Sequence, residues 1–205
     1  MKAQTMLTNA FAFRYACRRF DATRAIISSD LKFILEAGRL SPSSLGMEPW
    51  KFVVIRNSGI KRELYEAASK QEQLVSSSEI IVIVARVAEL QPDSGYVARM
   101  LRRFALSDER YAELLAFYRE QMRGRDLAAW SIAQCHIAAA NMMTAAAVSG
   151  IDSCPVGGFD AAQVGRILDI DIARFAIALI LPLGYRAEHP PLRYRLPLAE
   201  LIDYR

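Results

Sequence analysis

Arginine side chains gather near both ends of this 205-residue chain. Near the start and the end of the sequence stand Arg14, Arg18, Arg19, Arg24, Arg186, Arg193, Arg195 and Arg205. A guanidinium group offers forked N–H donors that match a phosphate or a carboxylate. The two clusters could therefore converge on one anionic ligand if the fold brings the chain ends together. Two separate, solvated basic patches are the alternative, and composition alone favours them.

A second stretch with chemical potential covers residues 41–56, SPSSLGMEPWKFVVIR. Small hydroxyl residues, a proline and a glycine lead through Pro49 and Trp50 into an apolar run. A turn of this composition exposes backbone N–H groups and short hydroxyl side chains at the mouth of a sheet. Such a surface can hold a flat cofactor with polar edges against the backbone.

The motifs of other enzyme classes are missing from the sequence. No GxGxxG follows a strand and no GxxxxGK[ST] occurs, which disfavours dinucleotide folds and P-loops. His136 and His189 lack metal-ligand spacing, so both are interpreted as structural and no metal site is expected. Neither a GxSxG elbow nor a Cys–His pair occurs, and Cys17 beside Arg18 is interpreted as a buried bystander thiol. An enzyme built from this sequence must take its chemistry from a cofactor.

Four segments of the chain carry recognisable short motifs in a fixed order. They are residues 14–21 (RYACRRFD), 41–52 (SPSSLGMEPWKF), 154–160 (CPVGGFD) and 184–197 (GYRAEHPPLRYRLP). In this order they resemble the RxSxRxF opening, the SPSxxNxQPWxF segment, the P-x-x-G-F loop and the closing GxP/GYR … KxRxP of the FMN-dependent nitroreductase family. Each motif alone is weak, but all of them in register, from about Arg14 to Pro197, indicate membership.

The resemblance implies an FMN site at the interface of a homodimer. Arginines from both chain ends match family positions that bind the phosphate or the ribityl chain. The turn serines match residues that approach the flavin from the partner subunit, and the loop glycines match backbone groups near the isoalloxazine N5, where a donor stabilises the reduced ring. Ordinary turn chemistry is the alternative for the serines and for the glycines. The implied cofactor-binding set is Arg14, Tyr15, Ala16, Arg18, Pro42, Ser43, Ser44, Gly46, Gln73, Pro155, Val156, Gly157, Gly158, Arg193 and Arg195.

The chain departs from the family pattern at several of these positions. Ala16 replaces a frequent serine, Gly46 stands where asparagine is common, and Glu48 replaces the glutamine before Pro-Trp. Gly157 stands where oxygen-insensitive bacterial members carry an acidic residue. FMN binding is still expected. The departures leave open the acceptor, the choice between NADH and NADPH, one- or two-electron reduction, and the choice of Lys70, Gln71 or Gln73 as the residue at the pyrimidine edge.

Bulk composition restricts the class of protein. A hydrophobic content of 53% with 23% charged residues favours an obligate oligomer, with an alanine-rich core as the alternative. A net charge of +4 and a pI near 9.1 are modest and mostly spread, so no nucleic-acid partner is expected. The three cysteines lack CxxC spacing, so neither a zinc site nor a disulfide framework is expected. Their free thiols predict a reducing, cytoplasmic location. The N-terminus is a poor signal peptide, and residues 130–149 are too polar for a membrane span.

Hydrophobic periodicity predicts the elements that must position these residues. A helix over residues 30–40 is expected to be capped by Ser28, Ser29 or Asp30, and residues 96–122 are expected to form two helices that meet near Ser107 and Asp108, with Asp108 able to cap the second. The tail from Gly184 is expected to be extended and docked. The other predicted elements are strands over 50–55, 80–85 and 176–183, the first two buried on both faces, and helices over 58–69, 130–149 (ending at Gly150) and 160–168 (capped by Asp160).

Together these features predict one α+β domain covering residues 1–205. The resemblance implies a nitroreductase-like fold, with a central, mostly antiparallel sheet flanked by helices and a C-terminal extension that docks on the partner subunit. It also implies an FMN-dependent oxidoreductase in which NADH or NADPH reduces the flavin and leaves, after which a nitroaromatic, quinone or related acceptor binds in the same place. No catalytic side chain, metal, nucleic acid or membrane is expected. The alternatives are a same-fold enzyme that destroys flavin or removes halide, which would need lid residues within 96–129, and a non-catalytic protein that binds flavin or nucleic acid.

Overall fold

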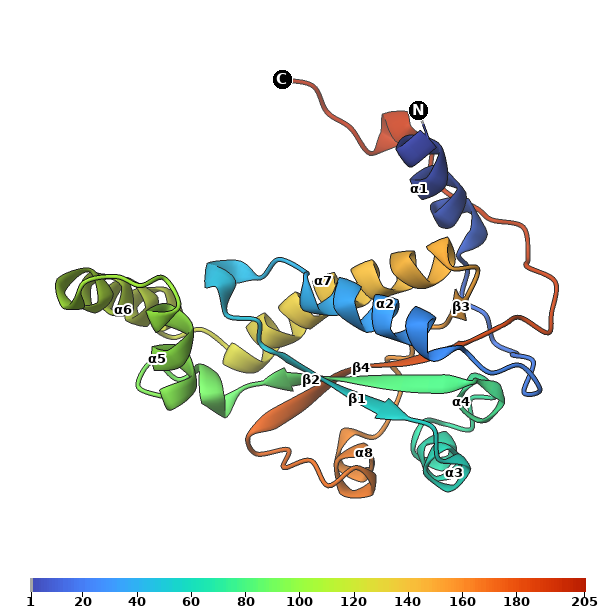
Figure 1. Ribbon diagram of the computed structural model, residues 1–205, viewed down its shortest axis with the longest axis horizontal. Helices are drawn as coiled ribbons and strands as arrows, with labels where there is room; N and C mark the ends of the chain where they lie inside the picture. The colour runs from blue at the N-terminus through green and yellow to red at the C-terminus, as the bar shows by residue number, and fades with distance from the viewer. Residues whose placement is uncertain (1) are drawn as a thin grey trace.

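The computed structural model describes residues 2–205 and shows one sheet with helices on both faces (Figure 1). The strands are β1 (Trp50–Ile55), β2 (Glu79–Arg86), β3 (Asp152–Ser153) and β4 (Phe175–Gly184). They lie in the order β1-β2-β4-β3, and each neighbouring pair is antiparallel. The predicted α+β class, the antiparallel sheet and its three longer strands are confirmed.

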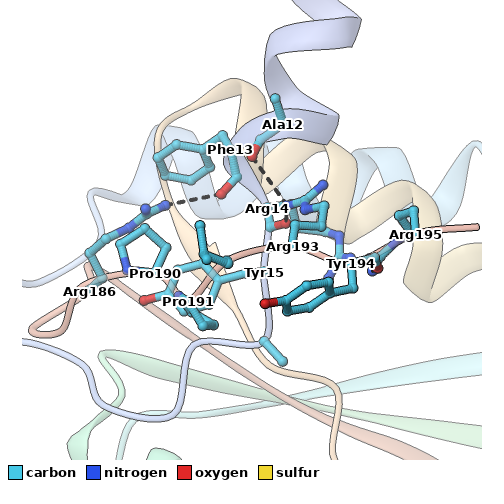
Figure 2. A pocket seen from close by; sticks show the side chains of 12 residues that line it. Ala12, Phe13, Arg14, Tyr15, Arg186, Pro190, Pro191, Arg193, Tyr194 and Arg195 are labelled. Atoms are coloured by element: carbon cyan, nitrogen blue, oxygen red, sulfur yellow. Dashed lines mark hydrogen bonds between the residues drawn. The ribbon is translucent and has the colours of Figure 1, made fainter.

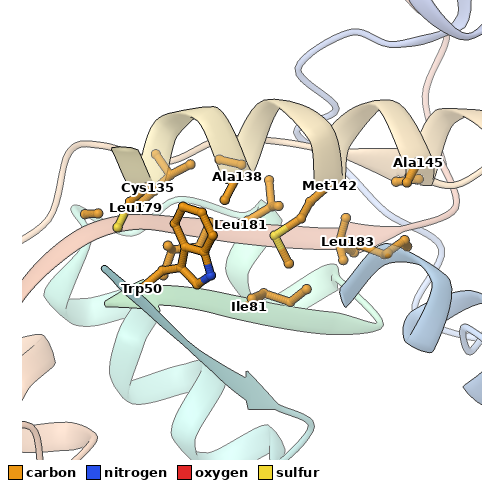
Figure 3. Close-up of a cluster of buried hydrophobic side chains, with 14 of the residues drawn as sticks. Trp50, Ile81, Cys135, Ala138, Met142, Ala145, Leu179, Leu181 and Leu183 are labelled. Atoms are coloured by element: carbon orange, nitrogen blue, oxygen red, sulfur yellow. The ribbon is translucent and has the colours of Figure 1, made fainter. Parts of the chain in front are cut away.

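Helices α2 (Ser28–Arg39) and α7 (Leu127–Val148) cover one face of the sheet. Figure 3 shows the side chains between α7 and the sheet, where Met142 and Cys135 of α7 pack with Leu181 of β4. Successive side chains of a strand point to opposite faces, so Ile81 and Ile83 of β2 belong to this core. The other face of the same strand is buried as well, which explains why its sequence is apolar without alternation.

The second face of the sheet packs on three shorter helices, α3 (Ser58–Ala67), α4 (Gln73–Ser76) and α8 (Ala161–Ile167). Ile80, Val82 and Val84 of β2 point into this second core. Asp160 accepts a hydrogen bond from the backbone N–H of Gln163 at 3.0 Å, so the predicted cap of α8 is confirmed. This core fastens the loop that precedes α8 to the sheet.

A separate lobe extends from one end of the sheet (green in Figure 1). It consists of α5 (Gly95–Arg102) and α6 (Asp108–Met122) and follows a short 3-10 turn at Ala88–Leu90. Its own cluster of buried side chains joins Met47, Tyr118 and Trp130. The Tyr118 hydroxyl is fully buried and donates to Leu90 O at 2.7 Å, which anchors α6 to the body.

The segments near the two chain ends meet beside the last turn of α7, away from the α5–α6 lobe (Figure 1). Helix α1 (Lys2–Phe13) packs against α7, and the extended tail runs past α1 with a single 3-10 turn at Leu198–Glu200. The tail contacts little of its own chain, because Leu192, Tyr194 and Tyr204 are each at least 80% exposed. The tail is therefore extended, as predicted, and its expected docking stays a prediction.

Several local predictions were wrong. Helix α2 begins at Ser28 with Ile27 at the N-cap and no side-chain cap, and β1 is an edge strand with Lys51 exposed rather than a strand buried on both faces. The side chain that caps α6 is Ser107, which accepts from the Arg110 N–H, and not Asp108. Helices α1 and α4 and strand β3 were not predicted. No helix within residues 2–205 is both long and apolar enough to span a bilayer.

Candidate cofactor site

The arginines near the start of the chain lie on the segment that leads from α1 to the sheet. Ala16 forms a parallel bridge with Ser153, and the Cys17 N–H lies 3.3 Å from Ser153 O. The segment turns at both ends of this bridge, because the Arg14 N–H bonds Ala10 O at the end of α1 and the Cys17 N–H also lies 3.1 Å from Tyr15 O. Cys17 is buried, whereas Arg18 is exposed. Burial raises the pKa of the Cys154 thiol, and Arg18 and Arg14 lower it, so both guanidinium groups lie near that side chain.

A cavity of ≈540 Å³ lies where the two ends of the chain meet (Figure 2). Residues 12–16 form one wall, and residues 186 and 190–195 form the other. Arg193 donates to Phe11 O at 2.5 Å and to Ala12 O at 3.2 Å, and it also bonds Arg14 O. A cation at the last carbonyls of a helix is favourable, so Arg193 fastens the tail to the C-terminus of α1. The first and last motifs of the sequence therefore do converge.

The cavity carries uncompensated positive charge. Burial lowers the pKa of Arg14, and the neighbouring Arg193 and Arg195 lower it further. None of these three side chains forms an ion pair with a carboxylate of residues 2–205, and no residue that lines the cavity is acidic. Arg186, in contrast, is neutralised by the buried Asp152 at 2.7 Å. Clustered guanidinium groups without counter-charge form a site for an anion, and a phosphate dianion fits it.

The loop after β3 supplies a second candidate surface. Val156 is buried and paired with Ile180, whereas Pro155, Gly157 and Gly158 are exposed. Within residues 2–205 neither glycine N–H has an acceptor, and a Cβ at Gly157 would meet nothing within 4 Å. Ser153 lies opposite Leu183 and Val156 opposite Ile180, so the loop runs about 10 Å along β4 from the bridge to Ala16. The free N–H groups of Gly157 and Gly158 therefore lie a short distance along the sheet from the segment that carries Arg14 and Arg18.

The glutamine next to this loop is Gln71 rather than Gln73. Gln71 donates from Nε2 to Gly158 O at 2.9 Å, and Gln73 donates to Gln71 Oε1 at the same distance. Gln73 is buried, and Lys70 forms an exposed ion pair with Glu66. Gln73 thus supports Gln71 from behind. Sequence spacing alone did not separate these neighbours, because α4 is a single short turn without periodicity.

The turn with Pro42, Ser43, Ser44 and Gly46 lies far from the arginine cavity within one chain. The Ser44 N–H bonds Gln134 Oε1 at 2.9 Å, which places the turn beside the first half of α7. The cavity lies beyond the last residue of α7, and the rise of a helix from Gln134 to Val148 is roughly 20 Å. Figure 1 shows the two regions near opposite ends of this helix. A single chain does not bring the two predicted halves of the site together.

No side chain in these regions is set up as a nucleophile or as an acid–base pair. Burial raises the pKa of Cys17 to about 11, so the thiol stays protonated and the prediction of a bystander thiol is supported. His136 is exposed on α7, and its Nδ1 lies 2.8 Å from Ile132 O. Residues 2–205 contain no cluster of His, Cys, Asp or Glu that could hold a metal ion.

Comparisons with known proteins show what this chain is similar to. The sequence profile of the Nitroreductase family matches residues 11–185. A Staphylococcus haemolyticus protein named as an NAD(P)H nitroreductase is 38% identical over 214 residues, covering 98% of each chain. A Bacillus subtilis protein of the same name class is 35% identical over 216 residues, again covering 98% of each chain.

Solved structures share the fold. A Bacillus subtilis nitroreductase structure superposes with a TM-score of 0.87 at 26% identity, covering 98% of this chain and 100% of its own. A nitroreductase from Exiguobacterium sibiricum, crystallised in complex with FMN, superposes with a TM-score of 0.82 at 21% identity, covering 97% of both chains. The latter identity is low enough that it supports the fold alone.

Proposed function

Because the chain belongs to the nitroreductase family, we propose that it is an FMN-dependent oxidoreductase in which NADH or NADPH is the electron donor. Its acceptors are electron-poor small molecules such as nitroaromatics and quinones, and donor and acceptor bind in turn at one place in a ping-pong cycle. Bound FMN supplies the chemistry, since its ring accepts a hydride and passes electrons to the acceptor. The residues of the chain bind and orient that ring.

One observation carries the proposal, the cavity in which Arg14, Arg193 and Arg195 meet without a counter-charge. Arg14 and Arg195 would hold the FMN phosphate, and Arg18, outside the cavity lining, would add positive charge nearby. Arg193 has its guanidinium on backbone carbonyls of residues 11, 12 and 14, so its part is to fix the tail that carries Arg195. The donors and the charge in this cavity fit a dianionic phosphate.

The loop at Gly157 and Gly158 fits the ring end of the same cofactor. The N–H groups of both glycines have no acceptor within residues 2–205, and the space beside the Gly157 Cα is open. A backbone donor at N5 would favour the reduced ring, because it acts where negative charge develops. Gln71 holds this loop through Gly158 O and lies next to the same surface.

A homodimer completes the site. Ser43 and Ser44 cannot reach the arginine cavity of their own chain, so a second copy would present them. The apolar surface that such an interface would cover is exposed in one chain, on α1 at Phe11, on α7 at Ile137 and along the tail. All three cysteines are free and buried, which fits a reducing, cytoplasmic compartment.

The test begins with the purified protein and its visible absorbance. A yellow protein, or a colourless one that takes up added FMN, is the expected result, and anaerobic NADH or NADPH is expected to bleach the flavin band. A nitroaromatic or a quinone should then restore the colour. A protein that never takes up FMN would contradict the proposal. Bound flavin that neither NADH nor NADPH bleaches would indicate a non-catalytic flavin-binding protein. Salt-sensitive binding of DNA or RNA would indicate a nucleic-acid-binding protein.

A further inference from the structure

The turn that carries Ser43 and Ser44 is fastened to the α5–α6 lobe by two side chains. The Tyr96 hydroxyl lies 2.8 Å from both Met47 O and Glu48 O. Arg103 donates from Nη1 to Glu48 Oε1 at 2.6 Å and from Nη2 to Gly46 O at 2.5 Å. Its Nε bonds Met100 O at 3.2 Å, so every nitrogen of this guanidinium is engaged and the fork is fully oriented.

The backbone of the turn needs such support. Leu45 has a φ of +56° and Glu48 a φ of +43°, in the left-handed region that side-chain-bearing residues disfavour. Conformations of this kind persist only where their surroundings determine them, and they concentrate at functional sites. Gly46, between them, has a φ of +62° without that cost. The turn would relax if its anchoring contacts were removed.

Glu48 links the anchor to the serine. Its backbone N–H donates to Ser43 Oγ at 2.8 Å, while its carboxylate pairs with Arg103. Ser43 Oγ is therefore held as an acceptor on one side, and its own hydroxyl proton is free to be donated. The Ser44 hydroxyl is exposed. Within residues 2–205 the side chain of Ser44 makes no hydrogen bond.

We propose that Glu48 is a positioning residue, which through its ion pair with Arg103 holds the turn at Ser43–Gly46 in the shape that presents its hydroxyls to the FMN bound by the second copy. This inference rests on the proposed function. It also gives a purpose to a position where the sequence departs from the family pattern, since a carboxylate pairs with a guanidinium more strongly than an amide does. Both partners are about 40% exposed, so added salt should weaken the pair.

The experiment measures FMN binding to apo-protein by flavin fluorescence and thermal unfolding of the same samples. The variants are Glu48→Ala, Arg103→Ala, their double mutant and Glu48→Gln. The control is Arg110→Ala, which removes an ion pair to Glu113 on α6 of the same lobe without touching the turn. Each single alanine variant is expected to weaken FMN binding about tenfold, as it would if the turn held its binding shape only about a tenth of the time. The double mutant should be no weaker than the worse single, Glu48→Gln should lie between, and the control should bind like wild type.

Three results would overturn the inference. They are unchanged FMN affinity in both alanine variants, losses that add fully in the double mutant, or lowered unfolding temperature with FMN affinity intact. Should Glu48→Ala not fold, Glu48→Gln and Arg103→Ala decide, because an unaltered FMN affinity in both contradicts the proposed ion pair. A wild-type protein that binds no FMN would overturn the proposed function, and this inference with it.

Discussion

Arg14 and Arg18 lie on the segment that joins α1 to the sheet, and their environments differ. Arg14 is half-buried, with its pKa lowered first by burial and then by Arg193 and Arg195. Arg18 is exposed and lies outside the lining of the cavity. An anion in the cavity would therefore lie among Arg14, Arg193 and Arg195, whose charges already repel each other. Such repulsion is relieved when a dianion binds, which favours occupancy of the cavity.

Removing a cavity arginine should weaken the binding of FMN and leave the fold intact. Arg14→Ala or Arg195→Ala is expected to lower FMN affinity at least tenfold, since a charged hydrogen bond contributes about 1.5–3 kcal/mol. Fluorescence titration of apo-protein measures the affinity. Arg166→Ala, an exposed change on α8, is the control. Full flavin retention in both cavity variants would show that the phosphate lies elsewhere.

Gly157 offers a test at the ring end of the site. Its φ is not in the left-handed region, and a Cβ there meets no atom of its own chain within 4 Å. Gly157→Val should therefore leave the unfolding temperature of the apo-protein nearly unchanged, yet weaken FMN binding about tenfold or more by occupying the ring's space. Calorimetry and flavin titration on one preparation separate the two effects. An apo-protein that loses stability instead would make this loop structural.

The elements that arrange these residues were predictable where burial repeats regularly along the sequence. Leu31 and Ile34 mark the buried face of α2, and the unbroken apolar run of β2 marks a strand with a core on each side. Helix α1 was missed because Thr5, Thr8 and Asn9 interrupt its apolar pattern, and its support comes from distant contacts with α7 and Arg193. Local sequence carries no trace of such contacts.

The site, like the elements, was predictable only where the pattern is local in the sequence. The arginines near both chain ends are visible in the sequence, but the meeting of Arg14 with Arg195 depends on pairing between Ala16 and Ser153 and on the bonds of Arg193 to α1. The relative roles of Gln71 and Gln73 likewise depend on where α4 lies against the Gly158 loop. Non-local pairing therefore limits what sequence alone gives at this site.

The crossing of α2 over α7 depends on one small residue. A Cβ at Gly38 would lie 2.9 Å from Met142 Sδ and 3.0 Å from Phe52 Cζ. Gly38→Val is expected to cost roughly 1–3 kcal/mol of unfolding free energy, because it overpacks this contact. Differential scanning calorimetry should show a fall in Tm of about 3–10 °C. Gly95→Ala, where no atom lies within 4 Å, is the matched control and should keep the wild-type Tm. Equal Tm values for both variants would show that the helices separate without cost.

At the scale of the whole molecule, one chain leaves a large apolar area in water. The exposed side chains lie on α1, on α7 and along the tail, and several are more than half exposed. Exposed apolar side chains on neighbouring elements are typical of an interaction site. Residues of α1 and of the tail also line the arginine cavity, so assembly and cofactor binding would share one surface.

Deleting residues 196–205 tests this arrangement. The deletion removes Leu196, Leu198 and Leu201, each more than 60% exposed, and burial of a leucine contributes about 1.5–3 kcal/mol. Sedimentation equilibrium should show a wild-type dimer and at least a tenfold weaker dimer after deletion. Ile172→Ser, an exposed change beside α8, is the control and should leave the dimer unchanged. A monomeric wild-type protein would contradict the two-chain site.

The meeting of residues 12–16 with residues 190–195 also sets an order of events during synthesis. The first wall of the cavity is synthesised long before the second wall. A nascent chain that stops short of residues 190–195 can pair β1 with β2, but it has no closed anion pocket. Contacts of such sequence separation also form late in refolding. Cofactor loading is therefore a step that follows the synthesis of residues 190–195.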